Sequence, residues 1–318
     1  MNESLIGRFG NWVRPWSELS PFTNVYGLSR TFLALASAAT LALNSSRTLF
    51  TPIAGTYETP RCSPGILRIS LYCLSPGRIE IARWVSVAIL LIIATGWRPR
   101  LTAIPHAWIA FSFFSSSTIF DGGDQINLVL TILLLPVALS DSRRWHWSAP
   151  DTRASHPLAN LIAWSAILMI RIQVAGVYFV SGISKLGQAE WANGTAMYYW
   201  LLTFGGAPRW FVLFLSKPLI VVTITWGAIV LEVALALALF LPKKRWPPLL
   251  VAGIAFHILI GLFLDLASFA LAMIAALILF LRPAEKSFHG FRLALRKKQA
   301  EPPKLADEPI SYRLPSES

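Results

Sequence analysis

Eight runs of apolar residues, most of them long enough to cross a membrane, dominate this 318-residue sequence. A helix that spans the hydrocarbon core of a bilayer needs about 20 residues. Only 14% of the residues are charged and 55% are hydrophobic, whereas soluble domains carry roughly 25% charged residues. We therefore predict an all-α fold, a polytopic transmembrane helix bundle of about seven or eight spans. The apolar runs are Val25–Leu43, Ile81–Trp97, Leu101–Ile119, Ile126–Leu139, Leu158–Gly182, Leu219–Leu241, Pro248–Leu264 and Leu266–Leu281.

Two segments depart from the simple spanning pattern. Ile126–Leu139 is short for a span and contains Pro136, so we expect it to be kinked, tilted or extended by its flanks. Thr195–Ser216 carries two glycines, a proline and an arginine in its middle. That composition favours a re-entrant or interfacial pair of short helices that does not fully cross the membrane.

The distribution of basic residues predicts the orientation. The net charge of +12 does not indicate nucleic-acid binding, because the Lys and Arg residues lie between apolar runs and in the C-terminal tail, where cytoplasmic loops collect them. Placing the N-terminus inside puts most of them on the cytoplasmic side, where they can contact anionic lipid. We expect an uncleaved first helix, a membrane domain over residues 1–282, and a basic, disordered cytoplasmic tail over 283–318.

The sequence has two cysteines, Cys62 and Cys73, and both fall in the long polar loop Asn44–Glu80. With the N-terminus inside, this loop lies on the oxidising side of the membrane, which favours a disulfide over two free thiols. Closing a loop of about a dozen residues would stabilise the fold by roughly 3 kcal/mol. Two cysteines and scattered histidines do not have the spacing of a metal site.

Ionisable residues inside apolar runs are costly, and they tend to mark functional positions. Arg171 and Glu232 lie deep in their runs, and the favoured interpretation is a structural ion pair across two helices. Arg30 lies in the first turns of the first helix and is equally well explained as an anchor at the interface. His257 is a lone histidine in a membrane helix, either a hydrogen-bonded core residue or a candidate catalytic residue.

The acidic turn Asp121-Gly-Gly-Asp124-Gln125 separates two apolar runs. An ordinary exoplasmic hairpin would explain it, and the alternative is a polar lip over a cavity or a carboxylate that faces Lys185. Asp265, at the outer end of its helix, is expected to be reached by water. The residues expected to line a polar cavity or its lip are Asp121, Asp124, Gln125, Arg171, Glu232 and Trp191.

Lys185 is the strongest candidate for chemistry. It stands where the longest apolar run turns polar, between Gly182 and Gly187. A lysine at this boundary can extend its amine to the interface, or it can be a desolvated base with a neutral amine. The position of Lys185 in the sequence, taken alone, favours the first interpretation, in which the amine anchors the helix end at the interface.

The segment Tyr178–Leu186, followed by Trp191 and Gly194, resembles the signature of the vitamin K-dependent gamma-carboxylase-like membrane domain, also called the horizontally transferred transmembrane domain. Phe256-His257 resembles the next helix of that family. The resemblance implies that Lys185 corresponds to the catalytic base of the carboxylase. The first lysine of that motif is replaced here by Ser184, and the linker from Leu186 to Trp191 is one residue longer.

A likeness over nearly the whole chain points to the bacterial sporulation-delaying protein B family. It is carried by Asn24–Arg30, the paired cysteines, the acidic turn and Asp141–Trp147. The resemblance implies a multi-pass protein of the bacterial inner membrane, and the distribution of basic residues predicts that both termini are cytoplasmic. It also implies partners: a secreted peptide toxin precursor and a small maturation protein.

Three functions follow from these observations. The leading hypothesis is maturation or export of a secreted antimicrobial peptide, with Lys185, His257 and the acidic turn around an outward-facing cavity. The second is a carboxylase-like enzyme that uses Lys185 as general base on a quinone-like cofactor or a peptide, and the third is a non-catalytic scaffold. The sequence has no ATP-binding loop, HExxH motif or GxSxG elbow, and it names no cofactor, substrate peptide or oligomeric state.

Overall fold

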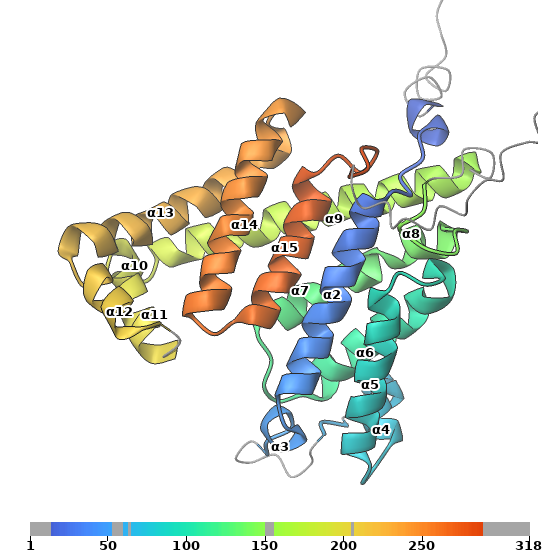
Figure 1. Cartoon of the computed structure of the whole chain (residues 1–318), viewed down its shortest axis with the longest axis horizontal. Coiled ribbons are helices and arrows are strands. Elements are labelled where there is room, and N and C mark those ends of the chain that lie inside the picture. The colour runs from blue at the N-terminus through green and yellow to red at the C-terminus, as the bar shows by residue number, and fades with distance from the viewer. Residues whose placement is uncertain (1–13, 53–59, 63–64, 150–155, 205–206, 289–318) are drawn as a thin grey trace, which may run out of the picture.

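The computed structural model describes residues 14–52, 60–62, 65–149, 156–204, 207–288 and, within this part of the chain, contains helices and no strand (Figure 1). The predicted all-α class is therefore confirmed. Residues 289–318, most of the predicted tail, lie outside the described residues, as does the N-terminal segment 1–13.

The helices follow the predicted apolar runs closely, and the loop Asn44–Glu80 adds short helical turns that the runs did not show. The longer helices are α2 (Asn24–Leu43), α5 (Ile79–Ala94), α6 (Pro99–Ser116), α7 (Gly122–Leu133), α9 (Pro157–Leu186), α13 (Pro218–Leu237), α14 (Trp246–Phe263) and α15 (Ala267–Leu281). The shorter ones are α3 (Ser46–Leu49), α4 (Leu71–Leu74), α8 (Leu135–Ser140), α10 (Ala189–Ala192), α11 (Ala196–Phe204) and α12 (Arg209–Leu215), with 3₁₀ turns at Ile66–Ile69, Ala238–Phe240 and Lys243–Arg245.

Within the described residues, five helical segments are long and apolar enough to cross a membrane. Three other predicted spans fall short of that standard. α5 has 16 residues and α15 has 15, while the 18-residue α6 carries an arginine, a histidine and several hydroxyl side chains. A count of seven or eight spans therefore stays a prediction. The five segments are Asn24–Leu43, Gly122–Ser140, Pro157–Leu186, Pro218–Phe240 and Lys243–Phe263.

Both unusual segments have the form that their sequences predict. The helix around Pro136 is interrupted at Leu134, between α7 and α8, because proline has no N–H to donate and its ring clashes with the preceding turn. The segment before α13 forms two short helices, α11 with 9 residues and α12 with 7. Neither is long enough to span a bilayer.

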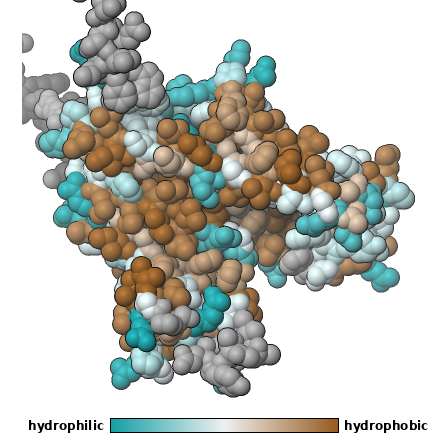
Figure 2. Space-filling view, turned by 180° about the vertical axis from the view of Figure 1, so that it is seen from behind, coloured by the Kyte–Doolittle hydropathy of each residue, from teal (hydrophilic) through white to brown (hydrophobic). Residues whose placement is uncertain are grey.

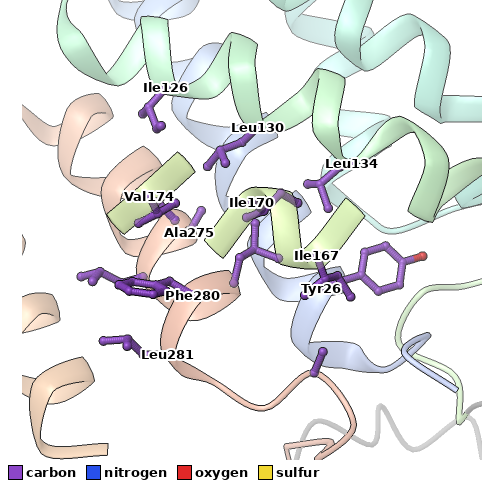
Figure 3. Packing of buried hydrophobic residues seen from close by; sticks show 14 of the residues in the cluster. Tyr26, Ile126, Leu130, Leu134, Ile167, Ile170, Val174, Ala275, Phe280 and Leu281 are labelled. Carbon is purple, nitrogen blue, oxygen red and sulfur yellow. The ribbon is translucent and has the colours of Figure 1, made fainter. Parts of the chain in front are cut away.

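The main hydrophobic core forms where α9 crosses α2, α7 and α15 (Figures 1 and 3). Figure 3 shows Ile167, Ile170 and Val174 of α9 among side chains from these helices. A second core packs α2 against α4, α5 and α6. Large apolar side chains also cover much of the surface (Figure 2), as expected where lipid replaces water as the solvent.

A disulfide joins Cys62 and Cys73, with 5.6 Å between their Cα atoms, as predicted. It lies at α4, beside the C-terminal end of α6, where the Cys73 sulfur contacts the Ser116 hydroxyl at 3.7 Å. The covalent bond therefore ties Cys62 to α4, whose Tyr72 is part of the second core.

A buried polar cluster fixes the other end of α2 to the segment that follows α8. The Tyr26 hydroxyl donates to Asp141, and both carboxylate oxygens of Asp141 accept from the Arg143 guanidinium at 2.9 Å. The side chains of Asp141 and Arg143 are 1% and 5% exposed. Two motifs more than 100 residues apart in the sequence thus form one structural unit.

Arg30 belongs to the same region and is not an interface anchor. Its side chain is only 1% exposed, and Nη2 donates to the Thr102 hydroxyl of α6 at 2.8 Å. The helices α2 and α6 enclose the guanidinium, so the interpretation as a side chain that extends to the interface is wrong.

Asp141→Ala should destabilise the protein strongly, by about 3–5 kcal/mol, because it leaves the buried Arg143 charge without its partner. Thermal unfolding of the detergent-purified protein would measure the change. Glu18→Ala is the matched control, since it breaks an ion pair whose side chains are 75% and 65% exposed and should leave the unfolding temperature nearly unchanged. Equal effects of the two variants would contradict a stabilising role for the buried pair.

Candidate functional site

Lys185 forms an ion pair with Glu232. Its Nζ lies 2.6 Å from Glu232 Oε2 and 2.9 Å from Oε1, and the two side chains are 15% and 8% exposed. The amine also donates to the Ser181 hydroxyl at 2.7 Å, and that hydroxyl donates to Glu232 Oε1 at 3.2 Å. Three polar groups from α9 and α13 therefore share one hydrogen-bonded triangle in an apolar surrounding.

Trp191 completes the surroundings of the amine. Its ring centroid lies 5.0 Å from Lys185 Nζ, within the range of a cation–π contact. Trp191 is 6% exposed and belongs to the short helix α10. This geometry does not fit a lysine that simply extends into water at the membrane surface.

Gly182 allows α9 and α13 to approach closely enough for this contact. A Cβ atom at Gly182 would lie 3.1 Å from Val233 Cγ2 and 3.4 Å from Glu232 Cβ. Small residues at helix crossings permit such close backbone approach in membrane proteins. The glycine before Lys185 thus sets the spacing between the two charges.

A second polar pair joins Tyr178, on the same helix as Lys185, to His257 of α14. The Tyr178 hydroxyl is 2.9 Å from His257 Nε2, and both side chains are buried. Among the described residues, His257 Nδ1 has no hydrogen-bond partner. This histidine therefore retains one ring nitrogen for a further contact.

Both polar groups adjoin a cavity of about 710 Å³ enclosed by α7, α9, α13, α14 and α15. Glu232, Ser181 and the Tyr178–His257 pair contribute to its wall, and Lys185 reaches it through Glu232. Phe256, Phe269 and Met273 are among its apolar wall residues. The cavity thus combines a mostly apolar surface with proton-carrying groups, which is the usual composition of a ligand site.

The scan against protein-family models matches the HTTM domain over residues 72–284. The chain is 38% identical over 286 residues to Uncharacterized protein YitO of Bacillus subtilis (strain 168), covering 86% of this chain and 90% of that protein. It is 34% identical over 275 residues to Sporulation-delaying protein SdpB of the same bacterium, covering 84% of each.

This chain belongs to the HTTM family. Within it, the identity to SdpB over most of both chains places the protein in the sporulation-delaying protein B family, as the sequence motifs indicated. No solved structure matches the chain. The HTTM match begins at Tyr72 and ends at Ala284, so it includes the cavity and both polar pairs.

The acidic turn of this HTTM protein is a helix cap beside the cavity. Asp121 and Asp124 form a capping box at the start of α7, each side chain accepting from the backbone N–H of the other. Their neighbours Gly122 and Gln125 line the cavity. The carboxylate that faces Lys185 is Glu232, so a direct contact of the acidic turn with Lys185 is not what the structure contains. Asp265 is exposed, as expected.

Arg171 is separate from this site, and the predicted Arg171–Glu232 pair is wrong. The Arg171 guanidinium lies 5.1 Å from the ring centroid of Trp246, and the residue is 7% exposed. Its Nε and Nη2 have no hydrogen-bond partner among the described residues. Glu232 pairs with Lys185 instead, because both residues lie where α9 and α13 cross at Gly182.

Tyr178 and Ser181 are the site residues that sequence reasoning did not single out. Ser181 precedes Lys185 by four residues and Tyr178 precedes it by seven, so all three lie along one face of α9. That spacing was a usable signal. No comparable signal links Lys185 to Glu232, because the two residues belong to helices separated by three short ones.

Replacing both members of the ion pair should lower the free energy of unfolding by less than the sum of the two single replacements. Lys185→Met and Glu232→Gln each leave one buried charge unpaired, whereas the double variant removes both charges. A double-mutant cycle on thermal unfolding should give a coupling of about 1–3 kcal/mol. The control cycle combines Glu232→Gln with Lys217→Met at an exposed position. The changes in unfolding free energy of these two variants should be additive. Coupling of similar size in both cycles would argue against the pair.

Gly182→Leu should separate α9 from α13 and destabilise the protein by about 1–3 kcal/mol through overpacking. Gly227→Leu on α13 is the control, because a Cβ at Gly227 meets no atom within 4 Å. Unfolding temperature and membrane abundance would measure both variants. A Gly182→Leu protein as stable as the Gly227→Leu protein would show that close approach at this crossing is not required.

Proposed function

We propose that this chain is a multi-pass membrane protein that takes part in maturing or exporting a secreted antimicrobial peptide of the sporulation-delaying type. Two observations support the proposal: the similarity to SdpB over 84% of both chains, and the Lys185–Glu232 pair beside a cavity large enough for several side chains of a peptide. The ion pair carries the proposal, because a passive membrane helix gains nothing from two buried charges that a pair of apolar residues would not supply.

The site has the groups for proton transfer at the cavity wall. Lys185 donates to Glu232, so a proton that moves between them exchanges an ion pair for a neutral amine and a neutral acid. The neutral amine is the form that acts as a general base. Tyr178 and His257 offer a second hydrogen-bonded pair at the cavity wall, with Nδ1 of the histidine available to a bound group.

The proposed topology has the N-terminus and the tail in the cytoplasm of a bacterium, with seven or eight spans of the inner membrane. The disulfide between Cys62 and Cys73 supports an oxidising environment for that loop. The cavity would then open toward the outer side, where a secreted precursor and a small maturation partner meet the protein.

A carboxylase-like enzyme acting through a quinone-like cofactor is the second candidate, and the apolar cavity wall favours it. The rings of Phe256 and Phe269 and the side chain of Met273 suit a flat, lipid-soluble group, with the Tyr178–His257 pair at its polar end. In this candidate Lys185 is the general base and Glu232 receives or returns its proton. A non-catalytic scaffold is the third, in which the pair is only structural.

Lys185→Ala and Lys185→Arg should abolish production of active peptide in a strain that makes the precursor and the partner protein. Alanine removes the amine, and a guanidinium keeps the charge but does not give up its proton. The measurement is growth inhibition of a sensitive strain, normalised to the abundance of each variant in the membrane. Lys217→Ala, which removes an exposed lysine of the same region, is the matched control and should keep full activity.

The two Lys185 variants together separate the scaffold from the two candidates that need chemistry at the amine. Loss of activity in both at normal abundance supports chemistry at the amine. Activity retained in Lys185→Arg alone would show that only the charge is needed, and activity retained in both would establish the scaffold role.

A further inference from the structure

A second cavity, of about 480 Å³, lies at the opposite end of α9 from the Lys185 site. Leu158 and Ile162 in the first turns of α9 form part of its wall. Leu158 precedes Lys185 by 27 residues, which at 1.5 Å per residue is about 40 Å along the helix. The two cavities therefore adjoin different parts of α9, the second one its first turns and the other its C-terminal half.

The floor of this second cavity is the buried pair of Asp141 and Arg143. Arg143 is held in place on several sides: it donates to both oxygens of Asp141 and to the Ser148 carbonyl. Tyr26 holds Asp141 in turn. The guanidinium thus has a fixed orientation before any ligand arrives, and Arg143 forms part of the cavity wall.

Arg100 supplies a second guanidinium at the rim. Its Nε donates to the Leu139 carbonyl at 2.8 Å, which fixes the direction of the side chain. No hydrogen bond from its two terminal nitrogens is found in the part of the chain that the structure describes. Two guanidinium groups and one carboxylate give the lining a net positive charge, and guanidinium groups bind phosphate oxygens well.

The remaining wall is apolar and faces outward. Leu158, Ile162 and Leu139 are 68%, 42% and 40% exposed, and all three belong to segments long and apolar enough to span the membrane. A soluble anion would use only the two arginines. A membrane lipid would use both parts, with its phosphate at the arginines and an acyl chain along the leucines.

We propose that this cavity binds the phosphate headgroup of an anionic membrane lipid, with Arg100 and Arg143 as the phosphate-binding residues and Leu158 and Ile162 as contacts of one acyl chain. The same phosphate chemistry could come from soluble phosphate, and the apolar wall favours the lipid. The site is independent of the peptide-maturation proposal, because no residue is common to the two cavities.

Native mass spectrometry of the full chain in mild detergent tests the proposal by titration with phosphatidylglycerol, phosphatidylcholine or inorganic phosphate. Phosphatidylglycerol should bind more tightly than the other two. Arg100→Gln should weaken that binding about tenfold, the loss expected for a charge-assisted hydrogen bond. Arg144→Gln is the matched control, because Arg144 is exposed in the same segment and does not line the cavity.

Ser142→Asp is a second variant in case Arg100→Gln fails to fold. Ser142 is exposed and lines the cavity, so a carboxylate there should repel the phosphate and lower phosphatidylglycerol binding by a similar factor. Equal weakening by Arg100→Gln and Arg144→Gln would overturn the site. Inorganic phosphate that binds as tightly as phosphatidylglycerol would overturn the assignment to a lipid.

Discussion

The structure around the candidate site depends on one electrostatic constraint: a charge placed among apolar helices needs a partner. Lys185 and Glu232 satisfy each other at 2.6 Å, and this contact requires α9 and α13 to cross where Gly182 leaves room. The crossing in turn places Ser181 and Glu232 on the cavity wall. A stability requirement and the chemistry of the site are therefore met by the same pair of side chains.

Two buried ion pairs connect different parts of the molecule. Asp141 and Arg143 connect the start of α2 to the segment after α8, whereas Lys185 and Glu232 connect the end of α9 to α13. Between them lies the main hydrophobic core of α2, α7, α9 and α15 (Figure 3), where the Asn127 amide also donates to the Leu33 carbonyl and the Ser37 hydroxyl of α2. Each of the two ion pairs thus contributes to the wall of a cavity, Asp141 and Arg143 to one and Glu232 to the other.

Apolar run length and composition predicted the helical class, the positions of the long helices and the interruption at Pro136. They could not decide how many helices cross the membrane, because α5 and α15 have 16 and 15 residues, near the lower limit of a span. For the site, family resemblance indicated Lys185, whereas Tyr178 and Ser181 on the same helix face were not singled out from the sequence. The choice of Glu232 over Arg171 as a partner depends on how helices distant in sequence cross, and a single sequence does not contain that information.

The length of α9 makes the protein sensitive to the thickness of the surrounding bilayer. Thirty residues extend about 45 Å, whereas the hydrocarbon core is about 30 Å thick. The helix must therefore tilt or project, and a thinner or thicker bilayer changes the tilt that suits it best. Because α9 carries walls of both cavities, the thickness of the surrounding lipid acts mechanically on the Gly182 crossing. Lipid composition is thus a physical variable of the site itself.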